Sequence, residues 1–120
     1  MSLLNNRFLT YFTESGAQAL EAAAKEISHS DGTIIFDEGG ISDCIYLVLE
    51  GKVKLSKKSG GQNDVEIAVV EAGDYFGELG VFDGSGRSAR AISSGPVRAG
   101  IIPCKQFREI LDREPLETTL

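Results

Sequence analysis

Residues 76–92 read FGELGVFDGSGRSARAI and combine one early acid, several glycines and an arginine between two apolar segments. A short helix beginning at Gly77 would direct the next three backbone N–H groups, those of residues 78–80, toward one point, and such amides bind anions. Glycine also allows a ligand to approach the main chain closely. Arg87 can fold back over the same point, so the stretch predicts a phosphate site with a single arginine.

The carboxylate of Glu78 needs its own explanation, because it repels a phosphate unless it is aimed at a donor. The ribose 2'-hydroxyl of a 3',5'-cyclic nucleotide is a donor beside a phosphate, and a carboxylate accepts from it. The Gly-Lys-Ser/Thr of a P-loop is absent. The alternative is that Glu78 only caps a helix while Arg87 pairs with Asp83 on the surface. The joint occurrence of acid, glycines and arginine favours the ligand hypothesis.

The surrounding segments predict a β-rich domain. Short apolar or alternating runs recur along the chain and are separated by turn signals such as DEGG, EGK and SSGP. These runs are residues 33–36, 45–49, 52–55, 65–70, 89–93 and 97–102. Their spacing is typical of an antiparallel sandwich or barrel, in which residues 52–55 and 65–70 form a hairpin.

Two amphipathic helices are expected to flank these strands. Residues 15–28 repeat apolar side chains at helical spacing, with Ser15 and Gln18 placed as a capping box. Residues 103–115 repeat them again, and Pro115 ends the segment. The apolar positions of the two segments are Ala17, Leu20, Ala24, Ile27, Phe107, Ile110 and Leu111.

Composition limits the classes of function. The 120 residues suit a single domain over residues 1–120, and 42% hydrophobic residues are enough for a core. A formal net charge of -6 leaves no broad basic surface, so we expect no direct nucleic-acid binding. The longest apolar runs are far shorter than a membrane span, and the N-terminal segment lacks the pattern of a secretory signal. We therefore expect a cytoplasmic protein that does not insert into a membrane.

The cysteines and the histidine give little support for a redox, metal-binding or catalytic site. Cys44 and Cys104 stand far apart without a CxxC motif, which favours two buried thiols in a reducing compartment and leaves a disulfide open. His29, the only histidine, lies in a polar turn that we expect to follow the first helix. No partner for a general base is near it in sequence, so we interpret it as a surface or capping residue.

The chain resembles the cyclic-nucleotide-binding domain found in catabolite activator protein, protein kinase A regulatory subunits and cyclic-nucleotide-gated channels. GTIIFDEGGISDCIYLVLEGKVKL is similar to the first strands of that family. EAGDYFGELGVFDGSGRSARA, residues 71–91, resembles its phosphate-binding cassette without a gap relative to the kinase form. The resemblance covers nearly the whole chain. It implies an antiparallel β jelly roll, or double-stranded β-helix barrel, with N-terminal helices and a C-terminal hinge helix.

The resemblance also implies roles for individual residues of the cassette (residues 71–91). The cradle for the ribose and the phosphate is formed by Gly77, Glu78, Leu79 and Gly80. The phosphate clamp is formed by Arg87, Ser88 and Ala89. In the family a threonine at the position of Ser88 accompanies cyclic GMP and an alanine accompanies cyclic AMP. We expect cyclic AMP, with cyclic GMP as the alternative.

Three positions depart from the family pattern. Gly86 replaces a proline, which should loosen the cassette. Arg90 replaces an apolar or small residue, and we expect it to point into solvent. The lid helix that covers the base is cut off after residues 103–115, so we expect a domain excised from, or regulating, a larger protein.

We therefore expect a non-enzymatic sensor without cofactor or metal, in which a cyclic nucleotide shifts the hinge helix and an effector domain or partner outside this chain responds. A homodimer is left open. One alternative is a metal-dependent cupin enzyme, against which the single histidine argues. The other is a degenerate domain that serves interaction or dimerisation with an empty or self-filled pocket, against which Glu78 and Arg87 argue.

Overall fold

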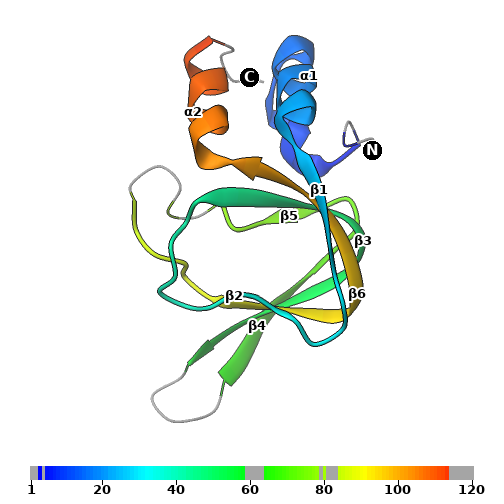
Figure 1. Ribbon diagram of the computed structural model, residues 1–120, viewed down its shortest axis with the longest axis vertical. Coiled ribbons are helices and arrows are strands. Elements are labelled where there is room, and N and C mark those ends of the chain that lie inside the picture. The colour runs from blue at the N-terminus through cyan, green and yellow to red at the C-terminus, as the bar shows by residue number, and fades with distance from the viewer. Residues whose placement is uncertain (1–2, 4, 59–63, 79, 81–83, 114–120) are drawn as a thin grey trace.

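The computed structural model describes residues 3, 5–58, 64–78, 80 and 84–113 (Figure 1). Three helices and six strands lie within these residues. The helices are the 3-10 helix η1 (Arg7–Tyr11), α1 (Glu14–Ala23) and α2 (Cys104–Arg113). The strands are β1 (Lys25–His29), β2 (Ile34–Phe36), β3 (Cys44–Lys58), β4 (Asp64–Glu71), β5 (Tyr75–Phe76) and β6 (Arg90–Pro103). The expected β-rich architecture with flanking helices is confirmed.

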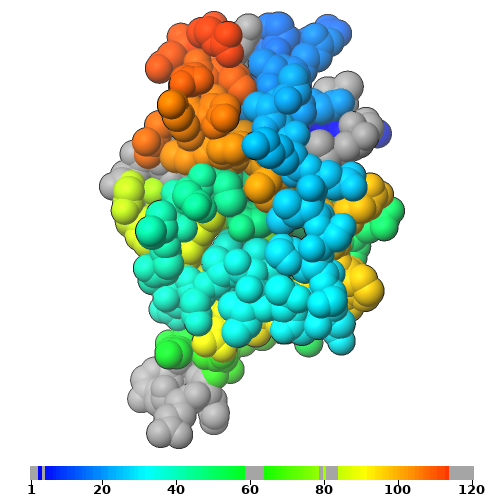
Figure 2. All heavy atoms as spheres, in the orientation of Figure 1, coloured from blue at the N-terminus to red at the C-terminus, as the bar shows by residue number. Residues whose placement is uncertain are grey.

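The strands form one antiparallel sheet with β3 and β6 at its centre. The order along the sheet is β1-β6-β3-β4, while β2 also pairs with β6 and β5 with β3. The sheet curls into a barrel-like body, with α1 and α2 side by side at one end and the β3–β4 hairpin at the other (Figures 1 and 2). This hairpin was expected from the sequence, and within it Lys52 lies opposite Glu71 and Val53 opposite Val70.

Two pairs of expected strands are in fact single long strands. Residues 45–49 and 52–55 lie in β3, and residues 97–102 lie with most of residues 89–93 in β6. Residues 45–49 and 52–55 were separated in the sequence by a turn signal, yet both belong to β3. Gly51 has a φ of +90°, and an added Cβ there would collide with the carbonyl oxygen of Pro96. The ladder between β3 and β6 shifts register between Val48 and Glu50 and again between Glu50 and Lys52. The glycine therefore produces a bulge rather than a reversal.

The first helix is shorter than the sequence predicts. It begins after Thr13, whose hydroxyl accepts from the N–H of Gly16, so the predicted capping box at Ser15 is wrong. It ends at Ala23, and the next residues form β1. His29 thus lies in a strand, opposite Val97, and not in a turn. Pairing with β6 overrides the helical pattern of Lys25–His29 because it satisfies the same backbone groups within the sheet.

The core consists of two clusters that share β3. Ile45 and Leu47 pack with the helices, whereas Val48 and Val53 pack inside the barrel. α2 follows β6 without an intervening loop, and its buried side chains Phe107 and Ile110 join the helical cluster, as predicted. No helix in the described part of the chain is long and apolar enough to cross a membrane.

Candidate functional site

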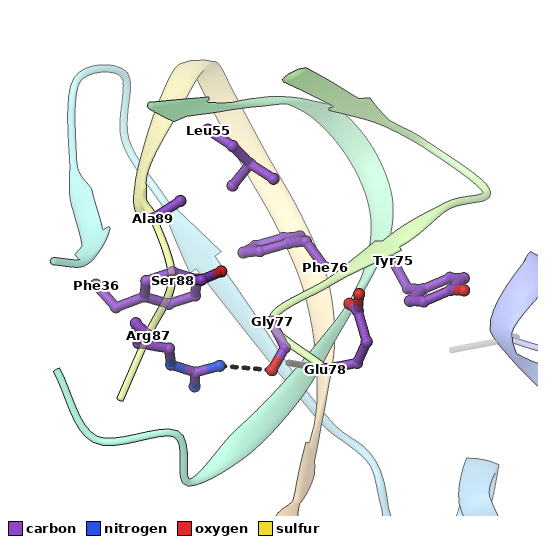
Figure 3. Close-up of a pocket in the computed structure, with 9 residues that line it drawn as sticks. All are labelled: Phe36, Leu55, Tyr75, Phe76, Gly77, Glu78, Arg87, Ser88 and Ala89. Carbon is purple, nitrogen blue, oxygen red and sulfur yellow. Dashed lines mark hydrogen bonds between the residues drawn. The ribbon is translucent and has the colours of Figure 1, made fainter. Parts of the chain in front are cut away.

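A pocket opens next to β5, within the cassette. It is lined by residues from β2, β3 and β5 and by two further stretches of the cassette, residues 77–78 and 87–89 (Figure 3). They are Phe36, Leu55, Tyr75, Phe76, Gly77, Glu78, Arg87, Ser88 and Ala89. Five of the seven site residues implied by the resemblance are among them. Gly80 is described but does not line the pocket, and Leu79 lies outside the described residues.

Arg87 is buried beside this pocket, with 4% of its surface exposed. Its Nη1 donates to the carbonyl oxygen of Gly77 at 2.6 Å, and its Nη2 donates to that of Cys44 at 3.0 Å. The guanidinium carbon lies 4.2 Å from the centre of the Phe36 ring. Arg87 therefore joins the cassette to β2 and β3, and it does not point freely into solvent.

Charge around Arg87 is incompletely balanced inside the protein. Oδ1 of Asp43 lies 3.5 Å from Nη2, but the Asp43 side chain is 74% exposed, so water screens this ion pair. Nε of Arg87 is buried and has no hydrogen-bond partner among the described residues. A buried N–H without an acceptor is costly. The guanidinium therefore retains both charge and one donor for an anion.

The aromatic and thiol groups beside Arg87 are neutral. Burial is the main cause that raises the pKa of the Tyr46 hydroxyl, and the hydrogen bond with Cys44 adds to it. Burial likewise raises the pKa of the Cys44 thiol. Cys44 and Cys104 are buried and form no disulfide, which confirms the expectation of two thiols. No competing anion therefore arises from these side chains near neutral pH.

Gly77 allows the arginine to approach. Its φ is +84°, and an added Cβ would lie 2.8 Å from Nη1 of Arg87. Gly77 and Glu78 belong to neither a helix nor a strand, so the short helix predicted to begin at Gly77 is not found at these two positions. Farther along, the N–H of Gly84 donates to the carbonyl oxygen of Gly80 at 3.0 Å. Of the other residues predicted to form this helix, Leu79 lies outside the described residues.

The remaining predicted residues differ in exposure. Glu78 is half-buried, and its carboxylate lies on the pocket side of the chain together with Gly77 (Figure 3). Ala89 is buried, whereas Ser88 is exposed while still lining the pocket. The arrangement brings a carboxylate, an exposed hydroxyl and a buried guanidinium to one cavity.

Sequence reasoning missed the aromatic walls of the pocket. Phe36 and Phe76 have ring centres 5.8 Å apart, and Phe76 stacks on Tyr46 at 4.8 Å with an interplanar angle of 10°. These residues occur in short strands, where an apolar residue is normally explained by the core alone. The only available signal was the adjacency of Phe76 to the glycine that begins the cassette cradle.

The expectation for Arg90 holds in part, because the side chain lies outside the pocket but is held by ion pairs. Its side chain is only 25% exposed and forms ion pairs with Asp37 and Asp64. Gly86 also packs closely, because an added Cβ would lie 2.9 Å from the carbonyl oxygen of Gly39. A residue with a side chain at position 86 would therefore push against the turn that contains Gly39, whose N–H bonds to the cassette.

Comparison with known proteins identifies the family. The family model for the cyclic nucleotide-binding domain matches residues 26–114, which include β1 to β6, the pocket and α2. The chain belongs to the cyclic nucleotide-binding domain family. The resemblance inferred from the sequence is confirmed, and the barrel is the jelly roll of that family.

Its relatives are regulatory proteins. The chain is 31% identical over 84 residues to a CRP-like cAMP-activated global transcriptional regulator of Mycobacterium tuberculosis, covering 68% of this chain and 38% of the relative. It is 34% identical over 88 residues to the cyclic AMP receptor protein of Thermus thermophilus, covering 73% and 41%. This cyclic nucleotide-binding domain therefore spans less than half of either relative.

A solved structure shows the same fold with a nucleotide. The regulatory domain of Toxoplasma gondii protein kinase A, crystallised with cAMP, superposes with a TM-score of 0.84 at 27% identity. The match covers 91% of this chain and 42% of that one. The fold of this cyclic nucleotide-binding domain is thus found in a protein that holds cAMP.

Proposed function

We propose that this domain is a cyclic-nucleotide sensor that prefers cyclic AMP to cyclic GMP and acts without catalysing a reaction. The observation that supports it most is the buried guanidinium of Arg87, which lies beside the pocket that Glu78 also lines and whose Nε has no hydrogen-bond partner among the described residues. Arg87 is the one cation among the described residues that line this pocket, which suits the single charge of a cyclic phosphate diester. Charge-assisted hydrogen bonds are stronger than neutral ones.

Each polar residue of the pocket has a distinct role in this proposal. Arg87 and the backbone near Gly77 and Gly80 hold the phosphate. Glu78 accepts from the ribose 2'-hydroxyl. Ser88 and Ala89 lie between the phosphate and the base, while Phe36 and Phe76 form the apolar walls. Because Nη1 of Arg87 donates to the carbonyl oxygen of Gly77, a phosphate bound by this nitrogen would share or replace that contact.

A conformational change caused by the ligand would reach the helical end of the domain through β6. This strand begins at Arg90, inside the cassette, and α2 begins at Cys104, directly after it. A shift of the cassette is thus connected to the helical end by a continuous strand. We propose that α2 is a hinge helix and that residues 1–120 act as one module on an effector elsewhere in a larger protein. A cytosolic location agrees with two cysteines that form no disulfide.

A second candidate is a domain whose pocket is satisfied by its own chain. It is favoured by the hydrogen bonds that the carbonyl oxygens of Gly77 and Cys44 already accept from Arg87. Such a domain would serve interaction or dimerisation without a ligand. It differs from the sensor in one measurable property, because it binds no cyclic nucleotide.

Isothermal titration of the 120-residue chain separates the two candidates. Cyclic AMP, cyclic GMP and 5'-AMP are titrated in turn, 5'-AMP being the control that has the base and ribose but an open, doubly charged phosphate. A sensor gives saturable binding of one cyclic AMP per chain, weaker binding of cyclic GMP and the weakest binding of 5'-AMP. Absence of binding by both cyclic nucleotides would refute the sensor and favour the self-filled domain.

A further inference from the structure

Arg90 joins the start of β6 to two other parts of the barrel. Its Nε and Nη2 donate to the two carboxylate oxygens of Asp37, at 3.0 and 3.1 Å. Its Nη1 donates to Asp64 at 3.3 Å. The bond to Asp37 is bidentate, a geometry that fixes direction as well as distance. Asp37 directly follows β2, and Asp64 is the first residue of β4.

Asp37 begins a turn that is bonded to the backbone of Arg87. We call residues 37–40 the glycine turn. The N–H of Gly40 donates to the carbonyl oxygen of Asp37 at 3.0 Å, which closes the turn. The N–H of Arg87 donates to the carbonyl oxygen of Gly40 at 2.7 Å, and the N–H of Gly39 donates to that of Arg87 at 2.8 Å. The glycine turn thus holds the main chain of Arg87 from both sides.

The glycine turn is itself held by the side chain of Arg90. This closes a loop of contacts from Arg90 to Asp37, through Gly40 to Arg87, and back along the chain to Arg90. The backbone position of Arg87 sets where its guanidinium reaches into the pocket. A loop that is already ordered loses less conformational entropy when a ligand binds.

We propose that Asp37 and Arg90 are positioning residues that hold the glycine turn against Arg87 and thereby increase the affinity for the cyclic phosphate. Neither side chain lines the pocket, so neither contacts the ligand. The affinity part of this inference rests on the proposed sensor function. The ordering of the Arg87 backbone does not, and it can be measured without a ligand.

Asp64 supplies a matched control. It is an aspartate that pairs with the same arginine, but it does so through Nη1 alone and from β4, which is no part of the glycine turn. Asp64→Ala therefore removes an ion pair of Arg90 while leaving the bidentate bond to Asp37. A purely stabilising role for the ion pairs predicts similar effects of the two aspartate substitutions.

The first measurement is amide hydrogen exchange of the ligand-free chain. Asp37→Ala should speed exchange of the Arg87 amide by about threefold or more, because the glycine turn that accepts from it is less restrained. Asp64→Ala should leave that amide within about twofold of wild type. Equal acceleration in both variants, or none in either, would overturn the positioning role.

The second measurement is cyclic AMP affinity. Asp37→Ala should raise Kd about threefold, Arg90→Lys should raise it less because a charge remains, and Asp64→Ala should leave it nearly unchanged. In the background of Arg87→Ala, Asp37→Ala should have no further effect, because the charged group that it positions is gone. Additive losses in that double variant would show that Asp37 acts only on overall stability.

The two measurements separate the two hypotheses. Failure of wild type to bind either cyclic nucleotide would refute the proposed function, while amide exchange would still decide whether Asp37 restrains Arg87. Normal binding by wild type together with unchanged exchange and Kd in Asp37→Ala would refute the positioning role alone.

Discussion

Nη1 of Arg87 donates a 2.6 Å hydrogen bond to the carbonyl oxygen of Gly77, a residue ten positions earlier in the cassette. This contact gives Arg87 a structural role in addition to the proposed role in binding. Its second bond, to Cys44, extends that role to β3. Substitutions at this arginine should therefore alter stability as well as binding.

Arg87→Ala should weaken both properties. Removing a charge paired with a partly buried phosphate should raise the Kd for cyclic AMP at least about thirtyfold. The carbonyl oxygens of Gly77 and Cys44 would lose their donor, at a cost of about 1 to 3 kcal/mol each in unfolding free energy. Titration and urea denaturation measure the two effects. Arg98→Ala, which removes exposed ion pairs elsewhere on β6, is the control and should leave Kd unchanged.

Gly77→Ala should disrupt the site by a different route. Alanine is strained at positive φ by about 1 to 2 kcal/mol, and here its Cβ would also displace Nη1 of Arg87. We expect at least about a tenfold rise in Kd. Gly73→Ala is the matched control, because Gly73 has a similar φ of +91° but open space around it. A similar Kd for the two variants would show that strain alone, and not the contact with Arg87, matters.

Glu78→Gln should reduce discrimination between ribose and 2'-deoxyribose. A hydrogen bond to a carboxylate contributes about 1.5 to 3 kcal/mol, so wild type should bind cyclic AMP at least about tenfold more tightly than its 2'-deoxy analogue. The ratio should fall in the variant. Glu71→Gln serves as the control, since Glu71 pairs with Lys52 outside the pocket. If wild type bound both sugars equally, the ribose role of Glu78 would be refuted.

Asp37 should contribute a pH-dependent part of the stability. The hydrogen bond from Arg90, and then that from the N–H of Glu38, lower the pKa of Asp37 below its ordinary value of 3.8. A lowered pKa stabilises the folded state above the ordinary pKa, and this contribution is lost as the pH falls through the folded value. The difference in unfolding free energy between wild type and Asp37→Ala should be constant from pH 7 to 5. It should shrink below about pH 4.

Urea denaturation of both proteins between pH 7 and pH 3 measures that difference. Comparison with the variant cancels the titration of the other acids. A difference that stays constant down to pH 3 would contradict the lowered pKa.

Much of the fold could be predicted from the sequence because its strands and α2 follow simple apolar patterns. The errors arose where contacts with distant residues outweigh those patterns. Lys25–His29 has the spacing of a helix but pairs with β6, and Gly51 reads as a turn but forms a bulge against Pro96. Neither partner is close in sequence, so the local pattern carries no sign of it.

For the candidate site, the sequence predicted which cassette residues come together but not which other residues hold them. The glycines, the acid and the arginine occur in one segment, so their association could be inferred directly. The burial of Arg87 could not, because the groups that hold it belong to β2 and β3. The position of Arg90 likewise depended on Asp37, which is distant in sequence and had no recognised role.

The ladder between β3 and β6 also has a consequence for how the molecule folds. Cys44 lies opposite Pro103 and Ser56 opposite Arg90, so these central strands join segments from the two halves of the chain. Sheets made of such distant pairings fold slowly, on the order of milliseconds to seconds. The contact of Arg87 with Cys44 likewise joins the two halves of the chain. During synthesis on the ribosome the pocket can therefore assemble only after β6 has emerged, and the early strands remain without their central partner until then.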